Sequence, residues 1–306
     1  MNFALAERND LMENIRLCEE CISCIIKKFA SEYPENCSEE QKLEYIKSVL
    51  GIISEASLSD SAPALVRKIN ELQENMWGSL KNYTDIKFYF NNLMLSMENK
   101  IRGKINKSTD KIESSIKYAM MGNYIDFGTE KNVDEEKLLE YIDGAEGICV
   151  NREELLRLEK ELEDAERLVY LTDNCGEIVT DKILISYIIE RYPKLKVEAI
   201  VRGGDVLNDA TMIDAKQVGL CDIVSVSDNG TRIAGTCLDE IDKKAKAKIE
   251  RADVIIAKGQ GNFETMRFCE KNVYYLFMCK CELFARRFNV ERYSGMLIND
   301  LRMPNI

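Results

Sequence analysis

Histidine is missing from this chain of 306 residues. Its absence excludes enzymes that depend on Ser-His-Asp or Cys-His groups, enzymes that form phosphohistidine, and zinc sites with imidazole ligands. Acid and base catalysis would have to come from carboxylates, lysine, tyrosine or water polarised by a metal ion.

Proline is also rare, with 4 residues in the chain, and no stretch has the composition of a Gly/Ser-rich linker, so the parts of the protein should pack on one another. No apolar run approaches the roughly 20 residues that a membrane-spanning helix needs. The segment Met1–Asp10 lacks the basic region followed by an apolar stretch that a secretory signal has. We therefore expect a cytoplasmic protein without a membrane partner.

Basic residues are outnumbered, because 42 Lys and Arg stand against 53 Asp and Glu and give a formal net charge of -11. This balance disfavours nucleic acid as a general partner, since phosphate backbones are bound by concentrated positive charge. A small anionic partner would have to be attracted locally, by a metal ion or a lysine. Nothing in the sequence indicates an oligomeric state.

What the chain does contain is a change of pattern near residue 165. The first part has helical periodicity and hardly any strand signal. It predicts helices at Asn9–Ala30, Ser38–Ile53, Ala62–Met76, Thr84–Met97, Lys100–Met121, Asp134–Ile142 and Asn151–Ala165, with Ser38 and Ser61 as caps. We assign residues 1–165 to a helical domain.

The second part alternates short apolar runs with helical patterns, which is typical of a parallel sheet. It predicts strands at 167–171, 195–201, 222–227, 252–257 and 273–277, and helices beginning near 176, 209, 238 and 262. The expected fold class is α/β, with a Rossmann-like three-layer core in residues 166–306 and the helical domain packed on it. We expect this α/β domain to bind metal and phosphate.

Polar side chains follow two of the predicted strands. Asp173 and Asn174 come after the first, and Asp209 comes after the second. Since the carboxyl ends of parallel strands lie at one edge of a sheet, these oxygens should converge. Carboxylate and amide oxygens suit a hard divalent cation. The alternative is that these residues only cap the helices that follow.

A glycine-containing loop follows the fourth predicted strand and reads Lys258-Gly259-Gln260-Gly261-Asn262. The glycines expose backbone N–H groups near a helix start and the lysine adds a positive charge, so the loop has the makings of a phosphate cradle. It is not a Walker A loop, whose lysine follows its glycines.

Taken in order, the motifs resemble the damage-control phosphatases, a metal-dependent family catalogued as domain-of-unknown-function family eighty-nine. The resemblance covers nearly the whole chain. It rests on Cys21-Ile22-Ser23-Cys24, Gly122 to Gly128, Asp173 to Glu177 with Asp181, Asn208 to Thr211 with Asp214, Lys258 to Glu264, and Lys280-Cys281. The cysteine motifs point to the branch found in archaea and bacteria. Cys175 and Asp205 depart from the family, which usually has a small residue and often a proline there.

The resemblance implies roles for these residues. One divalent ion, manganese, nickel, cobalt or magnesium, would be held by Asp173, Asn174 and Asp209, and Lys258 would meet the substrate phosphate. The other expected pocket residues are Asn123, Asp126, Glu177, Gly259, Gly261 and Asn262. The implied substrates are small sugar phosphates or damaged phosphometabolites. Water or a carboxylate remains open as the nucleophile, and Glu177 or Asp126 would orient water or protonate the leaving group.

The chain has 11 cysteines, which in a reducing compartment are not a disulfide framework. Cys21, Cys24 and Cys281 match cysteine positions of the family. A soft-metal or redox role competes with simple packing for this trio, and a zinc site would need a fourth thiolate, for which Cys18 is the nearest candidate.

Two other classes stay open. A nucleotide- or S-adenosylmethionine-binding α/β enzyme, such as a methyltransferase, would also carry acidic loops at its strand ends. It ranks second, because the first strand is followed by Asp173-Asn174 and not by G-x-G-x-x-G. A non-catalytic metal- or metabolite-binding protein ranks third, since ligands alone do not prove turnover.

Overall fold

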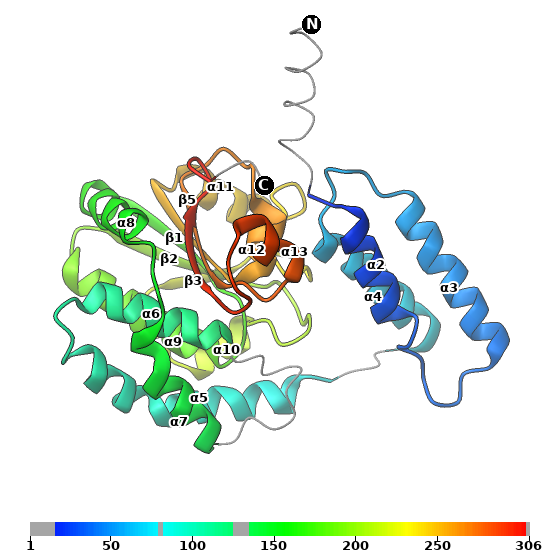
Figure 1. Cartoon of the computed structure of the whole chain (residues 1–306). Helices are drawn as coiled ribbons and strands as arrows, with labels where there is room; N and C mark the ends of the chain where they lie inside the picture. The colour runs from blue at the N-terminus through cyan, green and yellow to red at the C-terminus, as the bar shows by residue number, and fades with distance from the viewer. Residues whose placement is uncertain (1–15, 79–81, 125–134, 304–306) are drawn as a thin grey trace, which may run out of the picture.

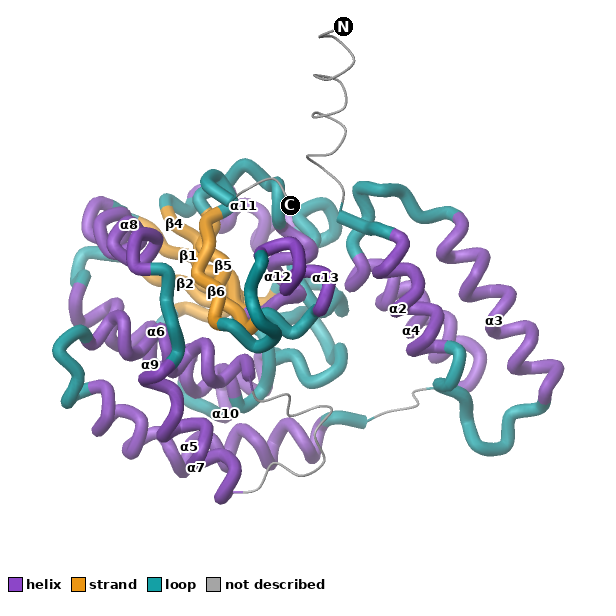
Figure 2. The backbone as a smooth tube through the Cα atoms, viewed as in Figure 1, coloured by secondary structure: helices purple, strands orange, loops and turns teal. Residues whose placement is uncertain are grey.

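The computed structural model describes residues 16–78, 82–124 and 135–303, and Figure 1 shows their arrangement. One sheet runs through the molecule with helices on both of its sides (Figure 2). Its strands are β1 (Arg167–Leu171), β2 (Lys196–Val201), β3 (Ser225–Asp228), β4 (Val254–Lys258), β5 (Val273–Met278) and β6 (Gly295–Asn299). The first five correspond to the predicted strands, and β6 was not predicted.

The helices of the described residues alternate with strands only in the second half of the chain. They are α2 (Glu19–Phe29), α3 (Glu39–Ser54), α4 (Ala62–Trp77), α5 (Thr84–Ile105), α6 (Lys111–Tyr124), α7 (Glu135–Gly144), α8 (Arg152–Asp164), α9 (Glu177–Arg191), α10 (Met212–Gln217), α11 (Lys243–Arg251), α12 (Gly259–Met266) and α13 (Glu282–Phe288). None of these helices combines the length and the apolar character that a membrane span requires.

The strand order is β3-β2-β1-β4-β5-β6, and every neighbouring pair is parallel except β5 and β6. The predicted α/β class with a mostly parallel sheet is therefore confirmed. The chain leaves β1 toward β2 and later returns to place β4 on the other side of β1. Such a switch point leaves a crevice at the carboxyl ends of the two strands, where α/β proteins bind ligands.

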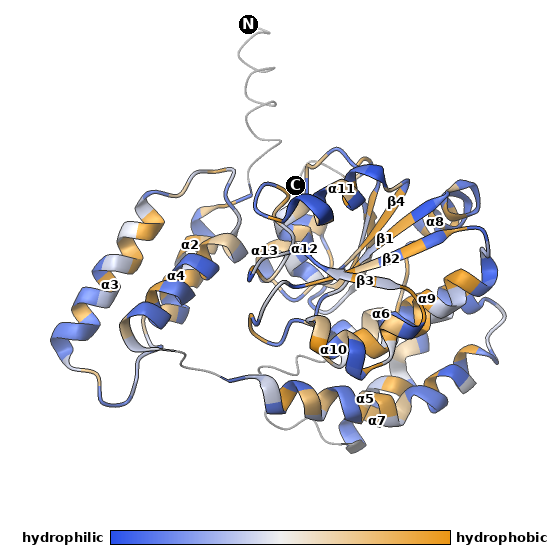
Figure 3. Cartoon of the chain, turned by 180° about the vertical axis from the view of Figure 1, so that it is seen from behind, coloured by the Kyte–Doolittle hydropathy of each residue, from blue (hydrophilic) through white to orange (hydrophobic). Residues whose placement is uncertain are grey.

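The two faces of the sheet bury different side chains. In β1, Leu168 and Tyr170 belong to a hydrophobic cluster with α5, α6 and α9, whereas Val169 and Leu171 belong to a cluster with α12 and α13. This alternation follows from the strand period of two. β1 and β4 are hydrophobic along most of their length in Figure 3, as expected for strands covered on both faces. The core therefore has three layers.

The predicted helix caps are present. Ser38 accepts a hydrogen bond from the backbone of Gln41 and forms a capping box with it, and Ser61 caps α4. The predicted helix break after Met97 is wrong, because α5 continues to Ile105. Burial of Met97, Ile101 and Ile105 on one face holds it together.

The helices before residue 165 fall into two groups. Buried side chains of α2, α3 and α4 form a cluster of their own, while those of α5 to α8 share the cluster on one face of the sheet. Figure 1 shows the first group beside α12 and α13. An ion pair between Glu20 and Arg286 and a bond from Arg16 Nε to the carbonyl of Arg267 join it there. The predicted domain boundary at residue 165 stays a prediction.

Candidate functional site

The loops that follow β1 and β2 are joined by backbone hydrogen bonds. The N–H of Ala210 donates to the carbonyl of Asp173 at 2.7 Å, and the N–H of Cys175 donates to the carbonyl of Asn208 at 2.8 Å. Asn174 and Asp209 thus face each other as an isolated antiparallel bridge. The structure therefore brings Asp173, Asn174 and Asp209 together at the carboxyl edge of the sheet.

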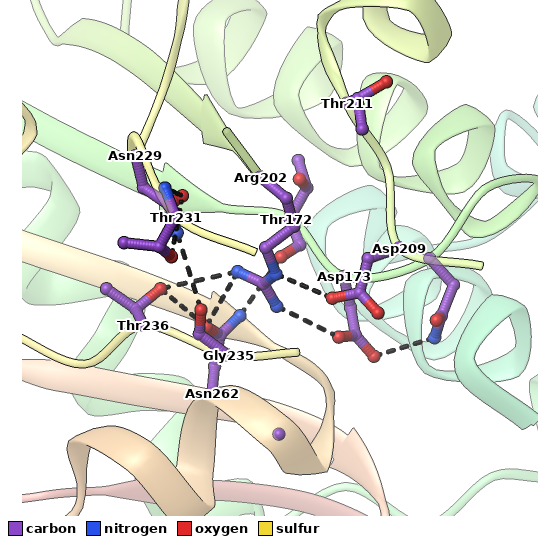
Figure 4. A network of polar contacts seen from close by, with 12 residues as sticks. Thr172, Asp173, Arg202, Asp209, Thr211, Asn229, Thr231, Gly235, Thr236 and Asn262 are labelled. Atoms are coloured by element: carbon purple, nitrogen blue, oxygen red, sulfur yellow. Dashed lines mark hydrogen bonds and ion pairs between the residues drawn. The ribbon is translucent and has the colours of Figure 1, made fainter. Parts of the chain in front are cut away.

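A buried guanidinium joins the two carboxylates (Figure 4). Arg202 directly follows β2 and is 1% exposed. Its Nε donates to Asp209 Oδ2 at 2.6 Å, and its Nη2 donates to Asp173 Oδ1 at 3.3 Å. No role was predicted for this residue, although an arginine immediately after a buried strand is a visible feature of the sequence.

Asn262 and Thr236 fix the other side of this guanidinium. Arg202 Nη1 donates to Asn262 Oδ1 at 3.2 Å, and Thr236 Oγ1 donates to the same oxygen at 2.8 Å. Asn262 Nδ2 donates to the carbonyls of Thr172 and Lys258. The side chain of Asn262, which the resemblance places at the substrate, thus fastens α12 to the loop after β1.

Asn174 is oriented by its neighbours. Its Nδ2 donates to Asp173 Oδ2 at 2.8 Å and to Glu177 Oε2 at 3.1 Å. Asn123, at the end of α6, donates to the same two oxygens at 3.1 and 3.0 Å. Because the amide nitrogen of Asn174 is engaged, its carbonyl oxygen is the atom left for a cation.

Lys258 lies behind this arrangement and is fully buried. Its Nζ donates to Glu177 Oε1 at 2.5 Å, to Asp181 Oδ1 at 2.8 Å and to the carbonyl of Ala119 at 2.9 Å. Burial lowers the pKa of this lysine, but Asp181 and Glu177 outweigh it, so the pKa lies above its usual value. A contact with a phosphate would require the loss of one of these buried contacts.

Asp181 is a second residue of the site for which no separate role was predicted. Its Oδ1 accepts from Lys258 and from the hydroxyl of Tyr170, whereas its Oδ2 has no hydrogen-bond partner. Burial raises the pKa of Asp181 to about 6 against the lowering effect of Lys258. Asp126, predicted at the pocket, lies outside the described residues.

Burial disfavours the ionised form of the two carboxylates of the site. Burial raises the pKa of Asp173 well above its usual value, Glu177 and Asp209 raise it further, and Arg202 and Lys280 lower it. Burial also raises the pKa of Asp209, against the effect of Arg202. An additional cation would stabilise the ionised form of both groups.

Gly259 and Gly261, which follow β4, are both required by close contacts. Gly259 has a φ of +78°, and a Cβ placed on it would lie 1.9 Å from Asp173 Oδ2. A Cβ on Gly261 would lie 2.2 Å from the carbonyl oxygen of Ala234. The start of α12 therefore lies directly against the Asp173 carboxylate.

Gly259→Ala should destabilise the protein by about 1 kcal/mol or more through its positive φ alone, and should displace the Asp173 carboxylate as well. The measurements are urea unfolding and divalent-ion titration. Gly51→Ala is the matched control, since a Cβ there, on the exposed side of the last turn of α3, meets nothing within 4 Å. The control should be as stable as the parent or up to about 1 kcal/mol more stable. Equal ion affinity in both variants would contradict the close approach.

Comparison with known proteins identifies the family. The model of the damage-control phosphatase ARMT1-like domain matches residues 17–296. The chain belongs to this family. The resemblance that the motifs indicated is therefore confirmed.

Two curated proteins and one solved structure of this kind are similar to the chain. A damage-control phosphatase of Archaeoglobus fulgidus is 29% identical over 280 residues, which are 88% of this chain and 94% of that protein. A damage-control phosphatase of Pyrococcus horikoshii is 36% identical over 189 residues, 59% of this chain and 62% of that protein. The crystal structure of a DUF89 family protein from Pyrococcus horikoshii has a TM-score of 0.74 and 25% identity, covering 93% of this chain and 99% of that chain.

The donor atoms of the site fit the divalent ion that family membership implies. Asp173, Asn174 and Asp209 offer only oxygens, as hard cations prefer. Among the described residues no group of three or more Cys, Asp or Glu is arranged to hold a metal ion, and the amide of Asn174 would add a third oxygen to the two carboxylates. The pKa values of both carboxylates lie above their usual value in spite of Arg202, mainly through burial, and this is consistent with a cation at this place.

The predicted cysteine trio does not form a metal site within the part of the chain that the structure covers. Cys18 Sγ lies 3.6 Å from Cys21 Sγ, Cys24 is exposed, and Cys281 precedes α13 as its N-cap. Burial raises the pKa of Cys21 to about 12. A redox role for the trio stays a prediction.

A cleft of about 1000 Å³ lies between the first group of helices and the loop that carries Asp209. Residues 205–207 of that loop line one side, and Arg67, Glu71 and Asn70 of α4 line another. Asp173, Asn174 and Asp209 are not among the residues that line this cleft, whereas Asn123 of α6 contacts the site directly.

Proposed function

We propose that this protein is a metal-dependent phosphatase that hydrolyses phosphomonoesters of small metabolites, such as sugar phosphates or damaged phosphometabolites. One observation carries the proposal: two buried carboxylates and an amide oxygen converge from adjacent strand-end loops at the switch point of the sheet. Membership of the damage-control phosphatase family supports it.

Asp173, Asn174 and Asp209 would hold one divalent ion, manganese, nickel, cobalt or magnesium. When bound, the ion supplies Lewis-acid stabilisation of the charge on a phosphoryl oxygen. The surrounding residues prepare its ligands. Glu177 and Asn123 hold Asn174 and Asp173 in place, and the first-turn amides of α12 lie beside Asp173 and lack intrahelical acceptors.

Because no histidine is available, the proton transfers of the reaction would fall to carboxylates, lysine, tyrosine or water. Glu177 lies next to the ligands but is fully buried and paired with Lys258. Its assignment as the group that orients water or protonates the leaving group stays a prediction, as does that of Asp126.

The function is tested on chelator-stripped protein supplied with one divalent ion at a time. A panel of sugar phosphates and nucleotides should release inorganic phosphate only when an ion is present, and the apoprotein should be inactive. Binding of an ion without turnover of any phosphomonoester would favour a non-catalytic metal-binding protein. Tight binding of S-adenosylmethionine or a nucleotide in a parallel titration, again without phosphate release, would favour the methyltransferase-like alternative.

A further inference from the structure

The loop that carries Asn174 is fastened to α5 by one side chain. Asn91 is 0% exposed, and its Oδ1 accepts a hydrogen bond from the backbone N–H of Gly176 at 2.6 Å. Gly176 is buried, follows Asn174 by two residues and is the N-cap of α9. A buried backbone N–H is costly to leave without an acceptor, so Asn91 fixes the place where the loop after β1 turns into α9.

The same side chain reaches the loop that carries Asp209. Asn91 Nδ2 donates to Asp214 Oδ1 at 2.9 Å. Asp214 Oδ2 accepts from both the N–H and the hydroxyl of Thr211, each at 2.8 Å. Thr211 follows Asp209 by two residues. Asn91 therefore joins the two segments that leave the expected metal ligands, one directly and one through Asp214.

The amide of Asn91 can take only one orientation. Its oxygen meets a backbone N–H, and its two amide protons go to the carboxylate of Asp214 and, at 2.8 Å, to Gln217 Oε1. Lys87, one turn earlier on α5, is 4% exposed and places its Nζ 2.8 Å from Asp214 Oδ2. α5 thus presents two buried polar side chains to α9 and α10, which lie beside it (Figure 1).

We propose that Asn91 is a positioning residue for the ligands of the divalent ion. It sets the spacing of Asn174 and Asp209 through Gly176 and Asp214, from a helix that carries no ligand itself. The inference rests on the proposed metal-dependent function and adds to it a residue of the helical part of the chain. Residues that orient metal ligands without touching the ion typically change its affinity by about 10- to 100-fold.

The test is Asn91→Leu in the full-length protein, with manganese as the probe. Calorimetric titration should show manganese affinity reduced about 10- to 100-fold, because the two ligand loops lose their common contact. With p-nitrophenyl phosphate as substrate, half-maximal activity should require correspondingly more manganese. The kcat at saturating manganese should return close to that of the parent, since Asp173, Asn174 and Asp209 are all still present.

Asn92→Leu is the matched control. Asn92 is the next residue of α5, is exposed, and accepts a hydrogen bond from Gln217 at 3.2 Å, so it contacts one partner of Asn91 but not the ligand loop. Its replacement should leave manganese affinity unchanged.

An exchange of charge between positions 91 and 214 separates positioning from a general loss of stability. Asn91→Asp alone sets a second carboxylate against Asp214 and should weaken manganese binding. When it is combined with Asp214→Asn, the carboxylate at position 91 can still accept from Gly176, the amide at position 214 can donate to it, and the total charge is unchanged. The double variant should therefore bind manganese more tightly than Asn91→Asp.

The outcomes against the proposal are distinct from those against the metal site. Manganese affinity equal to the parent in Asn91→Leu, with a parent that binds manganese, would overturn the role of Asn91 alone. A double variant that regains the urea midpoint of the parent without any gain in manganese affinity would also overturn it, because Asn91 would then serve only stability. A parent that binds no divalent ion would overturn both this proposal and the metal site.

Discussion

Asp209→Asn is expected to reduce metal-dependent phosphomonoester hydrolysis about a thousandfold or more, since a Lewis-acid ion supplies several kcal/mol to the transition state and each 1.36 kcal/mol is tenfold in rate. The substitution keeps the shape of the side chain. Its amide oxygen can still accept the hydrogen bond from Arg202, which is the one that Asp209 Oδ2 accepts now. What disappears is the negative charge that a divalent ion needs.

The measurement combines turnover with ion titration and urea unfolding. Asp209→Asn should bind the ion at least tenfold more weakly while keeping most of its stability, because a buried hydrogen bond is retained. Asp205→Asn is the matched control on the same loop, where the carboxylate is 68% exposed. Turnover and ion affinity equal to the parent in Asp209→Asn would remove Asp209 from the ligand set.

The outline of this site could be predicted from the sequence, because the loops that form it directly follow parallel strands that lie side by side. Asp173 and Asp209 each stand shortly after an apolar run of a length typical of a buried strand, and neighbouring parallel strands place their following loops together. The same reasoning placed Gly259 near Asp173, since β4 is the other neighbour of β1. No knowledge of side-chain packing was needed for these predictions.

Side-chain partners were harder to predict, since they depend on three-dimensional packing. Arg202 contacts Asp173 and Asn262, which lie 29 and 60 positions away in the sequence. Lys258 looked available for phosphate because its loop is rich in glycine, yet the side chain turns back under α9 to meet Glu177 and Asp181. The loop sequence alone does not say in which direction a lysine points.

The missed strand and the misplaced helix break have different origins. β6 exists because Gly295–Asn299 pairs antiparallel with the edge of β5, which is a contact outside its own neighbourhood in the sequence. The break predicted after Met97 ignored the apolar face that continues through Ile101 and Ile105, and the bond from Arg102 to Glu98 one turn earlier. The pattern there remains helical, and burial decides where the helix ends.

Lys258→Met is expected to lower the free energy of unfolding by about 3 to 5 kcal/mol, the usual cost of removing one partner from a buried ion pair. Glu177 and Asp181 would remain in the interior without their cation, and both are 0% exposed. A surface pair gives the control. Lys248→Met breaks a partly exposed contact with Glu198 and should cost between about 0 and 1 kcal/mol.

A second variant shows whether the lost stability comes from unpaired buried charge or from lost packing, with the urea midpoint as the measurement. When Lys258→Met is combined with Glu177→Gln and Asp181→Asn, no buried charge is left without a partner, so a large part of the lost stability should return. Activity should stay low in this triple variant, because Glu177 also orients Asn174. If Lys258→Met alone unfolds at the midpoint of the parent, the buried ion pairs do not stabilise the fold, and Lys258 is then available for another role. If the triple variant is no more stable than Lys258→Met, the loss arises from packing of the lysine chain and not from the uncompensated carboxylates.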